Sequence, residues 1–446
     1  MNRRWTRSWL PALHALTAAL LLGGTGGPLW AQAGPVEIVF ASGPDDTGTV
    51  QGLVDAFNRV HQGQVRVEWR EFPRESDAHR RELLGDLEAD PGGVDLIASD
   101  VVWTAELSHS GHVRDLTDRF YDDYDRESFL PAPLGSATYR LRIWGVPWYT
   151  DAGLLFYRRD LLAESGIDAP PATWEELEST ARRVMEASGT PYGFVFQGAA
   201  YEGGTANAAE FIWSAGGEVM TSRLAVTGVV VNTAMEIDAV SVGSEAAARG
   251  LDIARRLVSG GVAPRAVADF REAEALASFA DGESVYMRNW PYAYEVLRQA
   301  GLTEAQLGVA PLPSAGDGGR SASSLGGWNL MLNARSSDAE SDAAWTLIRY
   351  LTDPAQQRRQ ATEAGLLPVL EALYDDPGLS AEVPVLGVGK EVFAAQLHQR
   401  PMTPFYGDLS ARISETFTRL LRGDLTGTEA ASLLDRELRS IVARNR

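Results

Sequence analysis

Segments with the periodicity of strands alternate with segments that have the periodicity of helices along most of this chain. An apolar run at 36–41 precedes apolar residues at helical spacing over 50–60, and the alternating segment 65–71 predicts a second strand. A helix over 81–89 and a buried strand over 94–99 are predicted next. This order favours an α/β fold with parallel sheets over an all-β fold or a helical bundle.

The alternation continues in the second half of the chain. Thr173 and Glu176, which follow two prolines, form a capping-box pattern that predicts a helix to about residue 187. Further elements are predicted at 192–197, 246–258 and 272–280. With 446 residues, the chain is long enough for two domains that each bury a core.

The first 33 residues have the pattern of a secretory signal peptide. Three arginines precede a mostly apolar segment at 9–22, and Ala31-Gln32-Ala33 fits a small-x-small cleavage site. The apolar segment is short for a membrane span. We therefore expect cleavage after Ala33 and a soluble mature protein that begins at Gly34.

The absence of cysteine and the net charge exclude several classes of function. Without cysteine the chain can form no disulfide, perform no thiol chemistry and carry no lipoprotein anchor, so we expect a freely diffusing periplasmic protein. The net charge of −20 argues against binding to nucleic acid or to an anionic membrane surface, because both require clustered basic residues.

The segment 144–162 combines aromatic side chains with a carboxylate. Trp144, Trp148 and Tyr149 are followed by Asp151 and then by an apolar, strand-like run. A pyranose has apolar C–H faces and a rim of hydroxyls, so it fits flat aromatic side chains beside an ionised carboxylate. These residues alone also fit a buried strand pair with incidental aromatic residues, and both interpretations stay open at this point.

Four other segments repeat the combination of aromatic and polar residues. Asp100 follows the buried strand at 94–99, and ligands of open α/β sheets bind at the carboxyl ends of parallel strands. The other three segments are Met287–Tyr294 (MRNWPYAY), Gly326–Asn333 around Trp328, and RPMTPFY, which begins at Arg400. Each segment alone also fits a core tryptophan, a turn glycine or a surface arginine.

Motifs of enzymes are nearly missing from the sequence. It contains no GxSxG elbow, no HExxH, no Walker loop and no GxGxxG after a strand. His109 and His112 could share a helical face, but no third metal ligand is suggested. We therefore predict no catalytic residue, metal or cofactor. A carboxylate pair for glycoside hydrolysis stays open among 60 acidic residues, so an exported glycan-active enzyme is the alternative.

Together these segments resemble the bacterial extracellular solute-binding proteins of sugar ABC importers, and most of all their trehalose/maltose-binding branch. The resemblance covers essentially the whole chain after residue 33. Its most specific parts are SDVVW (Ser99–Trp103), PWYTDAGLLFYRRDLL (Pro147–Leu162), MRNWPYAY, LGGWNLMLN (Leu325–Asn333) and RPMTPFY (Arg400–Tyr406). It implies the two-lobed type II periplasmic binding protein fold, in which crossing hinge segments join two α/β lobes and a sugar binds between them.

The resemblance also implies which residues contact the sugar. They are Asp100, Tyr149, Asp151, Trp290, Tyr292, Gly326, Gly327, Trp328 and Arg400, with weaker matches at Asp46 and Arg80. The aromatic residues would stack on sugar faces, the charged residues would bond hydroxyls, and the two glycines would let backbone N–H groups approach the ligand. The family pattern has a glutamate where Asp46 stands, so that side chain is one methylene shorter here.

The implied organisation and function can be stated in the same terms. The expected parts are a signal peptide at 1–33, an N-terminal lobe of 34–150 and 291–334, and a C-terminal lobe of 151–290 and 335–446, with crossings near 149–153, 289–292 and 332–336. We expect a monomer that binds an α-glucosyl disaccharide, trehalose or maltose, and delivers it to inner-membrane permease subunits served by a separate ATPase. Sucrose, a glucosyl polyol or a longer oligosaccharide are the alternative ligands.

Overall fold

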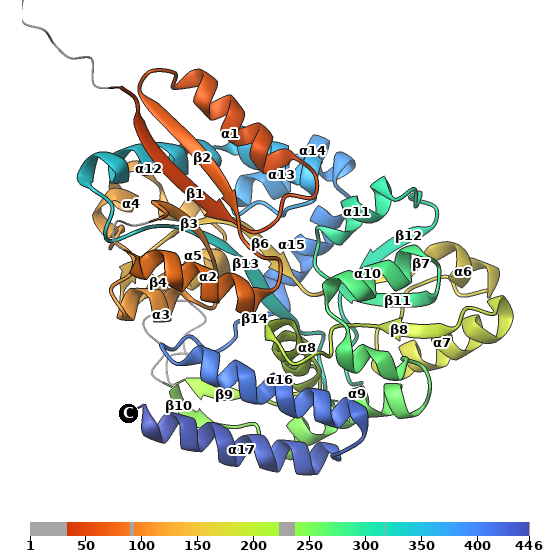
Figure 1. The fold of residues 1–446 in the computed structure, drawn as a ribbon. Coiled ribbons are helices and arrows are strands. Elements are labelled where there is room, and N and C mark those ends of the chain that lie inside the picture. Colours follow the sequence, from red (N-terminus) through yellow and green to blue (C-terminus); the bar gives the residue numbers. More distant parts are fainter. Residues whose placement is uncertain (1–33, 90–92, 223–236, 317, 446) are drawn as a thin grey trace, which may run out of the picture. The chain divides into compact units, whose positions relative to one another are not determined.

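A computed structural model describes residues 34–89, 93–222, 237–316 and 318–445 of the chain (Figure 1). Two β-sheets with helices beside them form most of this part. The predicted signal peptide, 1–33, lies outside the described residues. No helix within the described ranges is both long and apolar enough to cross a membrane.

The first sheet contains most of the N-terminal strands. Its order is β14 (Leu397–His398), β13 (Ser323–Leu332), β3 (Leu96–Asp100), β1 (Val36–Ser42) and β2 (Val65–Glu71), and β6 (Val146–Ala152) pairs with β13. Helices in this part of the fold are α1 (Thr49–Val60), α2 (Ser76–Glu88), α3 (Thr104–His109), α4 (Thr117–Asp123), α5 (Pro131–Ser136), α12 (Asp338–Leu351), α13 (Pro354–Ala364), α14 (Pro377–Glu382) and α15 (Val385–Ala395). A short hairpin, β4 (Thr138–Tyr139) and β5 (Arg142–Ile143), lies among them.

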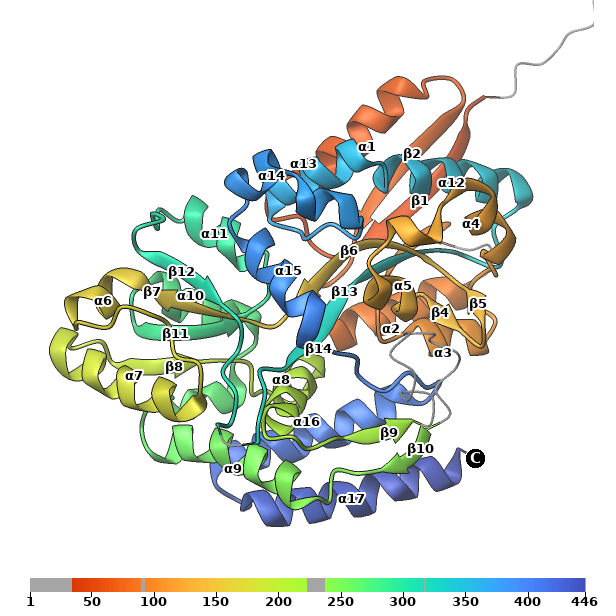
Figure 2. The same cartoon turned by 180° about the vertical axis from the view of Figure 1, so that it is seen from behind.

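The second sheet has the order β12 (Leu307–Ala310), β7 (Leu154–Arg158), β11 (Ser284–Asn289) and β8 (Tyr192–Val195). Its neighbouring helices are α6 (Arg159–Glu164), α7 (Trp174–Ser188), α10 (Glu272–Ala280) and α11 (Ala293–Gln299). Below them in Figure 2, α8 (Glu202–Ser214), α9 (Glu245–Ser259), α16 (Tyr406–Arg422) and α17 (Gly427–Arg444) pack on one another beside the pair β9 (Met220–Ser222) and β10 (Ile237–Val240).

The prediction of parallel sheets is only partly correct. β1 pairs in parallel with β2 and β3, and β8 with β11. However, β13 runs antiparallel to β3 and β6, and β7 runs antiparallel to β11 and β12. The chain forms β7 just after it leaves the first sheet, and it forms β13 just after it leaves the second. Both strands run opposite to the strands that βα units build.

The chain passes from the first sheet to the second at Gly153, where β6 ends and β7 begins, close to one predicted crossing. The other two expected crossings fall elsewhere. After β11 the chain stays with the second sheet, because β12 pairs with β7, and after β13 it stays with the first, because α12 contacts β1. β12 and α12 thus differ from their expected lobes, while the lobe boundaries as a whole remain a prediction.

The helix predicted after Thr173 shows how local sequence positions an element. Thr173 Oγ1 accepts a hydrogen bond from the N–H of Glu176 over 3.1 Å, which satisfies a free donor at the start of α7. Leu177, Ala181 and Val184 form the buried face of this helix, and Gly189 ends it in the left-handed conformation. The apolar spacing therefore orients α7 toward the second sheet.

Candidate functional site

Three neighbouring strands place the central residues of the site on one face of the first sheet. Trp328 on β13 is in register with Asp100 on β3 and with Tyr149 on β6, and Gly326 is in register with Asp151. Residues directly opposite each other in antiparallel strands, and residues two apart on one strand, point to the same side. The sequence spacing and the strand pairing thus bring two carboxylates and two aromatic rings together.

A close approach of backbones accounts for one of the two glycines. Gly327 has φ 117°, and a Cβ there would lie 2.5 Å from the carbonyl oxygen of Tyr149. Any other residue would clash and would be strained in this conformation. Gly327 therefore permits the tight pairing of β13 with β6.

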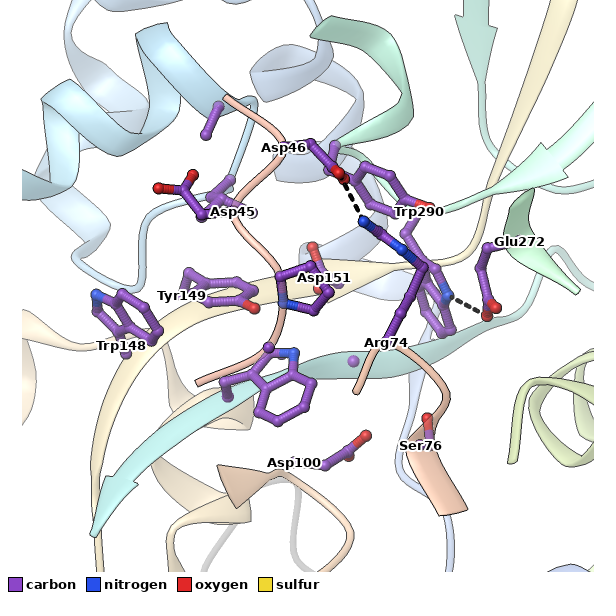
Figure 3. A pocket seen from close by; sticks show the side chains of 18 of the residues that line it. Asp45, Asp46, Arg74, Ser76, Asp100, Trp148, Tyr149, Asp151, Glu272 and Trp290 are labelled. Atoms are coloured by element: carbon purple, nitrogen blue, oxygen red, sulfur yellow. Dashed lines mark hydrogen bonds and ion pairs between the residues drawn. The ribbon is translucent and has the colours of Figure 1, made fainter. Parts of the chain in front are cut away.

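These strands form one wall of a cavity (Figure 3). Every predicted contact residue except Arg80 lines it: Asp46, Asp100, Tyr149, Asp151, Trp290, Tyr292, Gly326, Gly327, Trp328 and Arg400. Further lining residues that the sequence did not indicate are Asp45, Arg74, Ser76, Glu202 and Glu272, and Trp148 also contributes. The cavity thus collects side chains from loops of the first sheet and from segments around the second.

Arg80 lies elsewhere. Its Nε donates to Oε2 of Glu106 over 2.8 Å, and a second nitrogen bonds the same carboxylate, so its guanidinium is already engaged. Arg74, in the loop before α2, reaches the cavity instead and donates to Oδ1 of Asp46 over 2.6 Å. Figure 3 shows this ion pair at the edge of the cavity.

Asp151 is a buried acid of the site with a strongly raised pKa. The residue is 8% exposed, and its Oδ1 accepts no hydrogen bond within the described part of the chain. Burial, and secondarily the charge of Asp100, raises the pKa of Asp151 to about 7, while Arg288 opposes the shift. Burial also raises the pKa of Asp100, which accepts a hydrogen bond from the N–H of Val102 over 3.1 Å. Both carboxyls therefore present unused acceptor capacity to the cavity.

Arg400 and Glu202 form a buried ion pair beside these acids. Arg400 is 3% exposed; one of its nitrogens bonds Glu202, another donates to the carbonyl of Leu325 over 2.8 Å, and its Nε has no partner among the described atoms. The hydroxyls of Tyr406 and Ser410 also donate to Glu202, each over 2.5 Å. Glu202 is thus occupied by protein donors, and Arg400 keeps one free donor.

Glu272 is another acidic lining residue that the sequence did not reveal. Its carboxylate accepts from Tyr201 Oη over 2.7 Å and from Trp290 Nε1 over 3.3 Å (Figure 3). Glu202 and Glu272 are the first residues of α8 and α10, where acids are common because of the helix dipole. That preference does not distinguish a cavity residue from an ordinary helix start, so no local signal identified either.

Aromatic rings and carboxylates make up much of the lining. Its described residues include no His, Lys or Cys, and no group of three His, Asp or Glu side chains in the described ranges is arranged to hold a metal ion. Aromatic faces and hydrogen-bonding carboxylates instead match the apolar faces and hydroxyl rims of a carbohydrate.

Comparisons with known proteins agree with this geometry. A model of the bacterial extracellular solute-binding protein family matches residues 41–358. A probable ABC transporter-binding protein of Deinococcus radiodurans is 35% identical over 379 residues, which cover 84% of this chain and 85% of that protein. The structure of maltose-bound T. maritima MalE3 has a TM-score of 0.82 at 33% identity and covers 91% of this chain and 100% of its own.

A more distant neighbour shares the fold. An ABC transporter solute-binding protein from Thermotoga lettingae, bound with α-D-tagatose, has a TM-score of 0.79 at 22% identity, with coverage of 91% of this chain and 100% of that chain. The two structural likenesses confirm the predicted two-lobed type II fold.

Proposed function

We propose that this chain, which belongs to the bacterial extracellular solute-binding protein family, binds an α-glucosyl disaccharide, trehalose or maltose, in the cavity lined by Asp100, Asp151 and Trp328. The chain is the solute-binding component of an ABC sugar importer. The choice of disaccharide is supported by the likeness to a maltose-bound protein at 33% identity.

One observation carries the proposal. Asp100, Trp328 and Tyr149 lie side by side on three paired strands, and Asp151 adds a buried oxygen that has no hydrogen-bond partner among the described residues. A buried acceptor that lacks a hydrogen bond is unfavourable, and a sugar hydroxyl would satisfy it. The indole of Trp328 and the phenol of Tyr149 would lie against sugar faces. Arg400 would add its free Nε–H as a donor.

The remaining steps need no chemistry at the cavity. The protein would act as a monomer, and its two lobes would close on the sugar. The closed protein would then pass its ligand to the permease in the inner membrane, while a separate ATPase supplies energy. Export to the periplasm would follow cleavage after Ala33, and without cysteine the protein would remain unanchored. If mass spectrometry shows that the periplasmic protein still carries residues 1–33, the proposed cleavage is wrong.

The test is a calorimetric titration of purified protein with a panel of sugars. We expect the tightest binding with trehalose or maltose, and weaker binding with tagatose or ribitol. Tighter binding of sucrose, a glucosyl polyol or an oligosaccharide would replace the proposed ligand but keep the transport role. Release of glucose during incubation with the disaccharides would favour a glycan-active enzyme instead.

A further inference from the structure

The indole of Trp290 is held on more than one side. The guanidinium of Arg288 lies over its ring, with Cζ 3.9 Å from the ring centroid. At the ring edge, Nε1 donates to Glu272. Trp290 lines the cavity, and the guanidinium of Arg288 covers one face of its ring. A cation at this distance is attracted to the ring face, so Arg288 restricts how the indole can tilt.

Arg288 itself cannot move easily. It is 1% exposed, and its Nε and Nη2 donate to the two carboxylate oxygens of Glu210 over 2.8 and 2.6 Å. Its Nη1 donates to Gln197 over 3.2 Å. Such a bidentate pair fixes the plane of the guanidinium, and with it the surface on which the Trp290 ring rests.

Glu210 connects this pair to the strands that join the two sheets. Its Oε1 accepts from the N–H of Ser324, near the start of β13, over 3.0 Å. The same oxygen lies where a side chain of Gly153 would be, because a Cβ at Gly153 would be 2.1 Å away. Gly153 is the junction of β6 and β7. The pair therefore touches both segments at the point where the chain passes between the sheets.

We infer that Arg288 is a positioning residue that, through Glu210, fixes the Trp290 indole relative to the crossing strands β6 and β13. This inference rests on the proposed function, which assigns Trp290 to the sugar. Arg288 is not part of the cavity lining formed by the described residues, so its effect on ring position goes through its contact with Trp290, while its charge also acts on Asp151. A buried ion pair often stabilises a protein no more than apolar residues of similar size would. We therefore assign the pair the role of orienting the Trp290 indole.

The test removes both charges together, in the variant Arg288→Met with Glu210→Gln, so that no single charge is left buried. We expect the urea unfolding midpoint to stay near that of the wild type, because the pair as a whole adds little stability. Affinity for the best disaccharide should fall by about fivefold to tenfold, since an unfixed indole loses part of its contact. The matched control is Arg70→Met with Asp86→Asn, an ion pair of 2.6 Å outside the cavity lining, which should leave affinity unchanged.

A second measurement needs no sugar. Near-ultraviolet circular dichroism is recorded with and without Trp290→Phe, in the wild type and in the double variant, and the two difference spectra isolate the Trp290 band. We expect a distinct band in the wild type and its loss in the double variant, because a mobile indole has no fixed asymmetric environment. Arg288→Lys, which keeps the charge but not the planar fork, should weaken the band as well, and it serves if the double variant does not fold.

The outcomes separate the two ideas. Retention of the Trp290 band in the double variant or in Arg288→Lys would show that Arg288 does not position the ring. A normal affinity of Trp290→Ala for every sugar that the wild type binds would remove Trp290 from the proposed function, while the spectra would still decide on Arg288.

Discussion

Replacing Asp151 with Asn should change stability and sugar affinity in opposite directions. The pKa of Asp151 is raised by burial, and then by Asp100, from 3.8 to about 7. Between these values the folded protein keeps a proton that the unfolded chain has released, so stability falls as the pH rises through this interval. Above pH 7 the wild type carries the full cost of a buried carboxylate.

The size of this effect follows from the interval. A pKa that rises from 3.8 to about 7 corresponds to at most about 4 kcal/mol of stability lost at pH 8. Asn has nearly the same shape as Asp and no charge. The ligand-free Asp151→Asn protein should therefore be more stable than the wild type at pH 8, and the difference should shrink toward pH 5. Urea unfolding at both pH values measures it.

Affinity should move the other way. The amide no longer offers a charged acceptor to a sugar hydroxyl, which costs about 1.5–3 kcal/mol, or roughly a tenfold to hundredfold loss in affinity by calorimetry. Asp86→Asn is the control, because Asp86 is 25% exposed, pairs with Arg70 and lies outside the cavity lining. A variant no more stable than the wild type at pH 8 would refute the reasoning from burial, and an unchanged affinity would remove Asp151 from the site.

Other perturbations address a buried histidine, the crossing glycine and lobe closure. His79 is 1% exposed, and burial lowers its pKa to about 4, so the folded protein should lose stability as the pH falls from 6.5 to 4, where only the unfolded chain takes up a proton. His79→Phe should flatten that part of the urea-unfolding pH profile, and an unchanged profile would contradict this account. Gly153→Ala should destabilise the fold by about 1–3 kcal/mol, because its Cβ would overlap Glu210 and Arg288. An unfolding temperature equal to that of the wild type would argue against so tight a fit. Saturating disaccharide should reduce the radius of gyration in solution scattering, and an identical scattering profile would count against closure.

Local sequence predicts the elements of this fold better than their partners. The alternating segment 65–71 coincides with β2, and the buried run at 94–99 contains most of β3. The helix expected from residue 81 begins earlier, at Ser76, because Glu75 caps it by accepting from the N–H groups of Asp77 and Ala78. Apolar spacing could not reveal that first turn, since its residues are polar or small and carry no apolar periodic signal.

For the candidate site, too, the sequence predicts the arrangement within one segment better than the contacts between distant segments. Residues on one strand, such as Tyr149 and Asp151, share a face by spacing alone, and the family resemblance extended this to β3 and β13. Glu202 and Glu272 enter the cavity only through the long-range placement of α8 and α10. The choice between Arg74 and Arg80 likewise depends on Glu106, which lies on another helix and occupies Arg80. No spacing within the segment that holds both arginines contains that information.

The site residues on three paired strands, one residue on each strand, limit how the ligand preference of the protein can change over evolution or by design. Asp100, Trp328 and Tyr149 are tied together by backbone pairing, and a slip of one residue would turn every side chain of a strand to the opposite face. Asp46 and Arg74, by contrast, sit on loops between strands and helices, where length and sequence vary at little cost to the core. We therefore expect new sugar preferences to arise by exchange of this loop pair, while Asp100, Trp328 and Tyr149, which we propose contact a pyranose ring, stay unchanged.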